Sequence, residues 1–114
     1  MASSNQLEGK VCIVTGASTG LGRAIALRLA EGGAKLVVCA SRNSKHEGTD
    51  VSTEDLINQK YGANRAVFQR TDLIVVSDVE ACVKRAITEG GRLDVYVGSH
   101  IEHGHLKIIC CMSC

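Results

Sequence analysis

Short apolar runs rich in β-branched residues recur along the chain, with helical patterns between them. The first run, 10–14 (KVCIV), is followed at 20–31 by apolar residues at helical spacing, and then by a second run at 35–40 (KLVVCA). Continuous apolar runs of this length are typical of strands buried on both faces of a sheet. Gly32 and Gly33 stand where the helix would end. The opening therefore predicts a strand, a helix and a second strand, the repeating unit of a parallel sheet.

The same alternation continues, less regularly, as far as Val97. The polar segment 41–52 predicts a loop. Ser77 and Glu80 match a capping box, so we expect a long helix to begin at Ser77, with its apolar residues on one face. The other expected elements are a short helix at 53–61, a third strand at 65–69 and a fourth strand at 92–97.

These elements predict an α/β protein of the Rossmann type, with three layers and a partial parallel sheet of about four strands. Right-handed crossovers give the strand order 3-2-1-4, with the topological switch point beside the first strand. The first two helices would cover one face and only the third helix the other, so we expect a bare apolar strip. The fourth strand would be an unpaired edge.

Composition and charge exclude several classes of protein. The 114 residues carry a net charge of +1 without charged blocks, so no nucleic acid or anionic membrane is expected as a partner. No apolar stretch reaches the length of about 18 residues needed for a membrane span, and the N-terminus lacks a secretory signal. Cys12, Cys39 and Cys82 lie within apolar runs, where buried, reduced thiols are expected. A cytoplasmic location follows from this cysteine pattern.

The glycine-rich turn after the first strand is the strongest chemical signal. Thr15 to Gly22 reads T-G-A-S-T-G-L-G. Glycine supplies positive φ and lets backbone amides approach an anion at the N-terminus of a helix. A glycine turn that binds nothing is the alternative. Because a strand precedes this turn and a helix follows it, phosphate binding is favoured.

These residues match the T-G-x-x-x-G-x-G fingerprint, and the chain resembles the short-chain dehydrogenases/reductases over residues 7–97. Two further segments support the resemblance, Asp72-Leu73 after the third strand and 91–97 (GRLDVYV) at the fourth. The resemblance implies that a dinucleotide binds here, with the adenine beside Asp72 and Leu73. It also implies that the pyrophosphate and adenosine ribose are held by Gly16, Ser18, Gly20, Leu21 and Gly22.

The choice between NAD and NADP depends on the end of the second strand. An acidic residue there would accept hydrogen bonds from the ribose of NAD, but the segment 39–42 reads C-A-S-R and has no acid. Arg42 could pair with the 2′-phosphate of NADP through two hydrogen bonds. A solvated loop arginine is an equally good interpretation of Arg42. Because this segment has no acid and Arg42 could contact the 2′-phosphate, NADP is the expected cofactor, with NAD the alternative.

The resemblance stops after Val97, where the family continues with Asn-Asn-Ala-Gly and this chain reads G-S-H-I. Family members act through a Ser and a Tyr-x-x-x-Lys pair. Tyr61 and Tyr96 are followed four residues later by Arg65 and His100, so neither offers this pair. We therefore expect a truncated reductase that is inactive alone and has no catalytic residue. Its parts would be an NAD(P)-binding half-domain at 1–97 and a non-family tail at 98–114 that could be disordered. The segment 107–111 (KIICC) of this tail could instead cover part of the bare sheet face.

Two other functions stay open. A non-enzymatic nucleotide-binding or interaction fragment could pair its exposed edge with a full-length relative. A metal-binding protein could use the histidines and cysteines of the tail, although their spacing fits no common zinc site and no metal is expected. A terminal C-a-a-X lipidation signal fits Cys111 to Cys114 poorly. The candidate tail ligands are His100, His103, His105, Cys110, Cys111 and Cys114.

Overall fold

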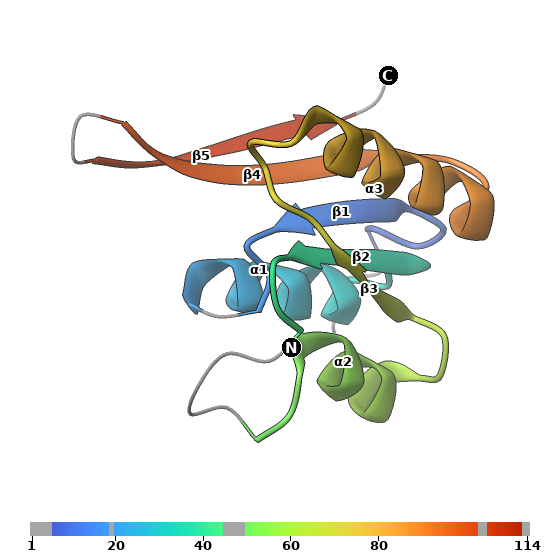
Figure 1. Cartoon of the computed structure of the whole chain (residues 1–114). Helices are drawn as coiled ribbons and strands as arrows, with labels where there is room; N and C mark the ends of the chain where they lie inside the picture. The colour runs from blue at the N-terminus through green and yellow to red at the C-terminus, as the bar shows by residue number, and fades with distance from the viewer. Residues whose placement is uncertain (1–5, 19, 45–49, 103–104, 113–114) are drawn as a thin grey trace.

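The structure is a computed structural model that describes residues 6–18, 20–44, 50–102 and 105–112, with side chains as far as Gly98. Its strands form one sheet in the order β3-β2-β1-β4-β5 (Figure 1). Strands β1 to β4 run parallel, which confirms the predicted order 3-2-1-4. The elements in chain order are β1 (Val11–Thr15), α1 (Gly20–Glu31), β2 (Leu36–Ser41), α2 (Thr53–Tyr61), β3 (Ala66–Arg70), α3 (Val76–Gly90), β4 (Val95–Glu102) and β5 (His105–Met112).

Two apolar clusters hold helices against the two faces of the sheet. On one face, Val14 and Val37 belong to the cluster that contains Ile57 of α2 and the inner side chains of α1. On the other face, Ile13 and Val38 pack with α3 through its buried side chains. Successive strand residues therefore alternate between the two clusters, as expected for strands covered on both sides. This arrangement confirms the predicted layers, with α1 and α2 on one face and α3 on the other.

The expectation of an unpaired edge at the fourth strand is wrong. Strand β4 continues past Val97 to Glu102, and β5 pairs with it in antiparallel register from Val95↔Met112 to Glu102↔His105. An antiparallel neighbour needs only a short connection, so the polypeptide that follows β4 can return along it directly. The outer strand on this side of the sheet is β5, and a partner could reach the edge of β4 only by displacing it.

The start of α3 also differs from the prediction. The N-cap is Val75, which makes no side-chain capping hydrogen bond, so the expected capping box of Ser77 and Glu80 is wrong. Instead Asp78 Oδ2 accepts a hydrogen bond of 2.9 Å from the backbone N–H of Asp72. The carboxylate of the first helical turn is thus used to fix the segment that leaves β3, and the turn from 72 to 75 decides where the helix begins.

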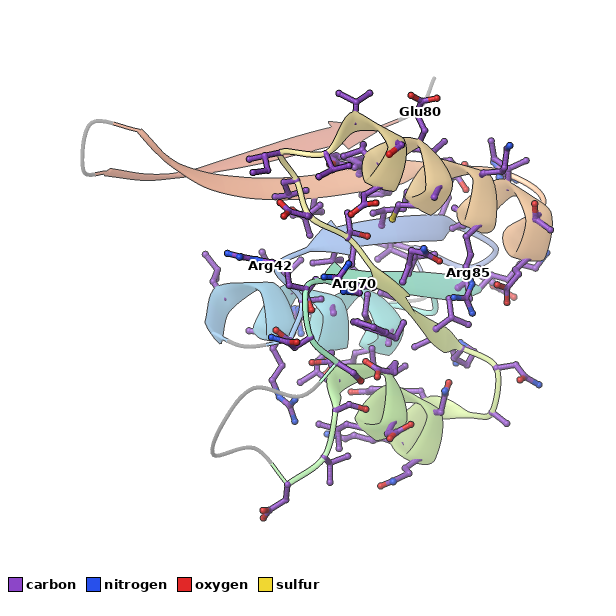
Figure 2. All side chains as sticks on the ribbon, viewed as in Figure 1. Arg42, Arg70, Glu80 and Arg85 are labelled. Carbon is purple, nitrogen blue, oxygen red and sulfur yellow. The ribbon has the colours of Figure 1, made fainter. Side chains whose placement is uncertain are left out.

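At the opposite edge of the sheet, a carbonyl group of β3 accepts a hydrogen bond from a side chain of α3. Arg85 Nη1 donates a hydrogen bond of 2.7 Å to the carbonyl oxygen of Phe68 and one of 3.2 Å to Oε1 of Gln69. Figure 2 shows Arg85 reaching from α3 toward β3. Exposed edge carbonyls are sites where another strand could pair. The Arg85 contacts reduce that exposure at β3.

A buried carboxylate joins β4 to β1. Asp94 Oδ2 accepts a hydrogen bond of 2.9 Å from the backbone N–H of Val11, and its other oxygen accepts from the Arg92 guanidinium at 2.7 Å. Burial by itself would raise the pKa of the Asp94 carboxyl, but the hydrogen bonds from Val11 and Arg92 and the nearby positive charge outweigh it, so that its pKa lies below the ordinary value. The charged form is therefore the one that stabilises the fold.

We predict that Asp94→Asn lowers the free energy of unfolding at neutral pH by about 2 kcal/mol. Because the folded-state pKa is lowered, the contribution of Asp94 is fully present above the ordinary aspartate pKa. It is lost as the pH falls through the lowered value. Urea unfolding of both proteins across acidic pH should therefore show two stability curves that converge in acid. Asp50→Asn, at an exposed acid, is the control; a constant gap between the Asp94→Asn and wild-type curves would refute the prediction.

Candidate functional site

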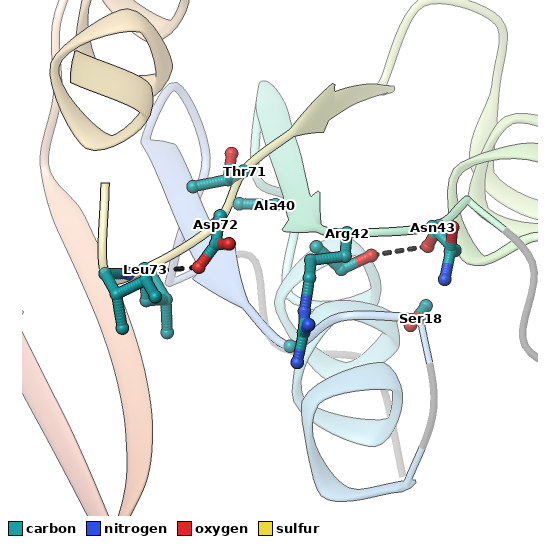
Figure 3. A pocket seen from close by; sticks show the side chains of 10 residues that line it. Ser18, Ala40, Arg42, Asn43, Thr71, Asp72 and Leu73 are labelled. Atoms are coloured by element: carbon teal, nitrogen blue, oxygen red, sulfur yellow. Dashed lines mark hydrogen bonds between the residues drawn. The ribbon is translucent and has the colours of Figure 1, made fainter. Parts of the chain in front are cut away.

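A cavity of about 420 Å³ opens at the carboxyl ends of β1, β2 and β3. It is lined by Gly16 and Ser18 from the turn after β1, by residues 40–43 at and beyond the end of β2 and by residues 71–74 after β3. Figure 3 shows Arg42, Asn43, Asp72 and Leu73 around this space. The carboxyl ends of parallel strands next to a switch point are where ligands of open α/β sheets bind.

Five of the eight residues predicted for the site line this cavity together. They are Gly16, Ser18, Arg42, Asp72 and Leu73. The other three, Gly20, Leu21 and Gly22, form the first turn of α1 directly behind the glycine turn and do not line the cavity. The sequence interpretation missed Asn43, Thr71 and Ile74, although each adjoins a predicted residue in the chain.

The glycine turn owes its shape to three glycines with different roles. Gly16 and Gly20 have φ of 65° and 57°, in the left-handed region that glycine adopts without strain. Gly22 is required by crowding, because a Cβ there would stand 2.0 Å from the carbonyl oxygen of Gly16. The turn is tied to β2 by a hydrogen bond of 2.8 Å from Gly16 N–H to Ala40 O. The backbone thus folds tightly over the N-terminus of α1, where unpaired N–H groups favour an anion.

Thr15, the first residue of the fingerprint, stabilises the switch point. Its side chain is buried, and Thr15 Oγ1 donates a hydrogen bond of 3.2 Å to the carbonyl oxygen of Val97 on β4. This bond joins the carboxyl end of β1 to the neighbouring parallel strand β4 across the switch. Gly98 lies next to it, with a position for Cβ only 3.6 Å from Thr15 Oγ1.

The segment after β3 presents apolar side chains at the rim of the cavity. Asp72 Oδ1 accepts a hydrogen bond of 3.2 Å from Ile74 N–H, which closes a tight turn. This turn leaves Leu73 47% and Ile74 89% exposed. Exposed aliphatic side chains beside a polar cavity suit the flat face of an aromatic ring such as adenine.

The segment after β2 contributes positive charge. Arg42 is exposed and lines the cavity, and Arg70 stands at the end of β3, with its Cα in register with Ser41 (Figure 2). None of the ion pairs between described residues involves either arginine. Among the described residues that line the cavity, Asp72 is the one acid, on the β3 side. The ends of β2 and β3 together therefore offer an electropositive environment to an anion.

Two side chains that could in principle carry proton transfer or nucleophilic attack, Tyr96 and Cys39, have raised pKa values. Burial, with the charge of Cys82 adding to it, raises the pKa of Tyr96, the opposite of what a catalytic tyrosinate needs. Burial, with the charge of Glu54 adding to it, raises the pKa of Cys39 to about 12, so its thiol stays protonated. Tyr61 packs against the core, and its ring is 5.6 Å from the Lys60 ammonium group.

The predicted alternatives that involve the tail lie outside the described side chains, which end before His100 and the five other candidate ligands. Among the residues whose side chains are described, no cluster of three or more His, Cys, Asp or Glu could hold a metal ion. The described helices include none long and apolar enough to cross a membrane. Cys12, Cys39 and Cys82 are buried thiols, as expected.

A parallel sheet in the order 3-2-1-4, with a glycine turn at the switch point, defines a nucleotide-binding α/β fold of the Rossmann type. The family model described as short chain dehydrogenase matches residues 10–99. The chain belongs to this family, whose members are oxidoreductases that bind nicotinamide dinucleotides.

Individual relatives agree with this assignment. An uncharacterized oxidoreductase of Listeria monocytogenes is 40% identical over 77% of this chain and 33% of its own length. A short chain dehydrogenase/reductase of Aspergillus oryzae is 39% identical over 85% of this chain and 35% of its own. The chain thus spans about a third of the length of the curated relatives that it matches.

Solved structures show the same fold. A dehydrogenase/reductase of Sinorhizobium meliloti superposes with a TM-score of 0.73 and 35% identity, over 90% of this chain and 39% of its own. A 3-ketoacyl-(acyl-carrier-protein) reductase of Brucella melitensis, solved in complex with NADH, superposes with a TM-score of 0.64 and 33% identity, over 80% of this chain and 34% of its own.

Proposed function

We propose that this chain binds a nicotinamide dinucleotide in the cavity at the ends of β1, β2 and β3, with NADP(H) preferred over NAD(H). The observation that carries the proposal is that the cavity gathers Gly16, Arg42 and Asp72 at one switch point. The glycine turn lies close over the N-terminus of α1, with Gly16 and Gly20 at positive φ and no room for a Cβ at Gly22, and backbone N–H groups at such a turn suit a pyrophosphate. The NADH complex of the Brucella reductase supports the class of ligand.

Each part of the cavity suits one part of the ligand. The glycine turn and the N-terminus of α1 would take the pyrophosphate, since the helix end contributes about half a positive charge. Asp72 and Leu73 would flank the adenine. Ser41, Arg42 and Asn43 would surround the adenosine ribose, and no acid stands among residues 39–43 to accept hydrogen bonds from its hydroxyl groups. A guanidinium at this place favours a 2′-phosphate.

The preference for NADP(H) is tested by titrating NADPH and NADH into the purified chain and into Arg42→Ala. Calorimetry is suitable because the chain has no tryptophan whose fluorescence could report binding. We expect Arg42→Ala to weaken NADPH binding by about 10-fold to 100-fold and to leave NADH binding within about twofold, because only NADPH carries the phosphate that the guanidinium would contact.

Lys84→Ala is the matched control. It also removes one exposed positive charge, but from α3 and outside the residues that line the cavity. Its affinities for both ligands should equal those of the wild type. Equal losses of NADPH affinity in Arg42→Ala and Lys84→Ala would refute a specific role of Arg42. Absence of saturable binding of either dinucleotide to the wild type would refute the proposed function itself.

We propose further that these 114 residues transfer no hydride by themselves. The family's Ser and Tyr-x-x-x-Lys pair is not present in the sequence, and the described tyrosines offer no substitute. Reduced nicotinamide absorbance should therefore stay constant when the chain is mixed with NADPH and carbonyl compounds. A cytoplasmic location is proposed from the buried thiols. Truncation and pairing with a full-length relative stay predictions.

A further inference from the structure

The first residue of α2, Thr53, makes a buried contact with the glycine turn that the fingerprint does not include. Its side chain is 0% exposed, and Thr53 Oγ1 donates a hydrogen bond of 2.6 Å to the carbonyl oxygen of Ala17. Ala17 is also 0% exposed and stands between Gly16 and Ser18, the two turn residues that line the cavity. A residue 36 positions away in the sequence therefore holds the middle of this turn.

A second side chain, that of Arg23, donates a hydrogen bond to the same hydroxyl group. Arg23 Nη1, on α1, donates a hydrogen bond of 3.2 Å to Thr53 Oγ1 and one of 3.0 Å to the carbonyl oxygen of Val51. The hydroxyl of Thr53 thus donates to the turn and accepts from the helix that follows the turn. Its orientation is determined by these two partners, because a hydroxyl has one proton to donate.

The Ala17 carbonyl oxygen is buried with its residue, and Thr53 is the hydrogen-bond donor that reaches it in the described contacts. Without that donor, a buried carbonyl would lose its partner, which is unfavourable and drives the peptide unit to rotate toward another donor or toward water. Rotation of the Ala17–Ser18 peptide would turn the Ser18 N–H, because both groups belong to one planar unit. Ser18 lines the cavity, so this rotation would redirect an N–H group at the place where the anion would bind.

We propose that Thr53 is a positioning residue for the dinucleotide site, and that it fixes the direction of the N–H groups in the glycine turn. The inference rests on the proposed function, since it assumes that this turn receives the pyrophosphate. It also links the two halves of the site, because α2 follows the segment that carries Arg42. Thr53 acts through Ala17 and has no contact with the ligand of its own.

The test compares Thr53→Val, which keeps the shape of the side chain and removes the donor, with Thr53→Ser, which keeps the hydroxyl. Both are titrated with NADPH and NADH by calorimetry, and their thermal unfolding is measured. We expect Thr53→Val to bind both dinucleotides about 5-fold to 10-fold more weakly, since the pyrophosphate is common to them, and Thr53→Ser to stay within about twofold of the wild type.

Ile57→Val is the matched control for loss of stability. It removes a methyl group from another fully buried side chain of α2 that belongs to the apolar cluster and not to the turn. Its melting temperature should fall while its affinities stay unchanged. If Thr53→Val binds like the wild type, or if Ile57→Val weakens binding as much, the proposal is overturned.

A fourth variant covers the case in which Thr53→Val does not unfold cooperatively. Arg23→Gln removes the guanidinium that orients the Thr53 hydroxyl and leaves Thr53 in place. About 3-fold weaker binding of both dinucleotides is expected, and wild-type affinity would overturn the proposal. Failure of the wild type to bind any dinucleotide would instead contradict the proposed function, so the two failures are distinguishable.

Discussion

Replacement of Gly22 by alanine is expected to weaken dinucleotide binding strongly and to lower the stability of the chain. The new Cβ would stand 2.0 Å from the carbonyl oxygen and 2.6 Å from the carbonyl carbon of Gly16, both in the backbone. No side-chain rotation relieves such a contact, so α1 or the glycine turn must move. We expect a loss of about 3 kcal/mol in the free energy of unfolding and roughly 100-fold weaker NADPH binding, because the turn can no longer present its N–H groups to the pyrophosphate.

Gly32→Ala provides the control for the chemical change itself. Gly32 does not have positive φ, and a Cβ there would meet the side chain of Leu7 at 3.0 Å and the carbonyl oxygen of Leu29 at 3.5 Å, an ordinary contact distance. That side chain can move, so the stability should change by less than about 1 kcal/mol and NADPH affinity should stay the same. Calorimetric titration and urea unfolding measure both quantities. Wild-type binding by Gly22→Ala would show that the crowding at Gly16 has no role in recognition.

The second large effect is expected at Arg65, which the sequence interpretation placed at the start of a strand and excluded as a substitute for the family's lysine. Its guanidinium donates hydrogen bonds to the carbonyl oxygens of Ala34, Tyr61 and Ala30, at 2.8, 2.9 and 3.0 Å. Two of these carbonyls, those of Ala30 and Tyr61, belong to the last turns of α1 and α2, where the helix itself supplies no N–H partner. The Ala30 oxygen also accepts a hydrogen bond of 3.1 Å from Gly33 N–H. One side chain therefore stabilises the ends of both helices on the same face of the sheet.

We predict that Arg65→Ala lowers the free energy of unfolding by about 3 kcal/mol, since three partly buried carbonyls lose a charged donor. Arg65→Lys should recover only part of this loss, because an ammonium group cannot reproduce the planar fork of donors. Arg28→Ala is the control: it removes an exposed arginine whose ion pair with Glu31 is worth less than about 0.5 kcal/mol. Similar unfolding curves for Arg65→Ala and Arg28→Ala would contradict this account.

The role of Arg65 also explains why Tyr61 and Arg65 do not replace the family's Tyr-x-x-x-Lys pair. The spacing places both residues near the end of α2, but Arg65 is bonded to backbone carbonyls, including that of Tyr61 itself. An arginine engaged in this way has a structural role at the end of α2. The sequence could exclude the pair on chemical grounds, whereas the structural use of the arginine depends on contacts between α1, α2 and β3.

Much of the site was predictable because its residues follow strands directly. Once the apolar runs place β1, β2 and β3 side by side, their carboxyl ends must meet at one edge, and Gly16, Arg42 and Asp72 meet there. The neighbours of these residues, such as Asn43 and Ile74, join the cavity for the same reason. By contrast, nothing in the local pattern around Thr53 indicates its bond to Ala17, since the two residues are brought together only by the packing of α2 beside α1.

The sequence by itself determined the succession of strands and helices to Val97, the order of the four parallel strands and the glycine turn at the switch point. These features follow from short-range periodicity, from the chirality of crossovers and from the φ values open to glycine. Only the tertiary structure decided that β5 pairs with β4, that α3 begins at Val76 without the capping box, and that Thr53 and Arg65 stabilise parts of the chain distant from them in sequence. Each of these depends on hydrogen bonds between segments whose meeting is decided by packing, because a donor and an acceptor far apart in the sequence leave no local pattern of their own.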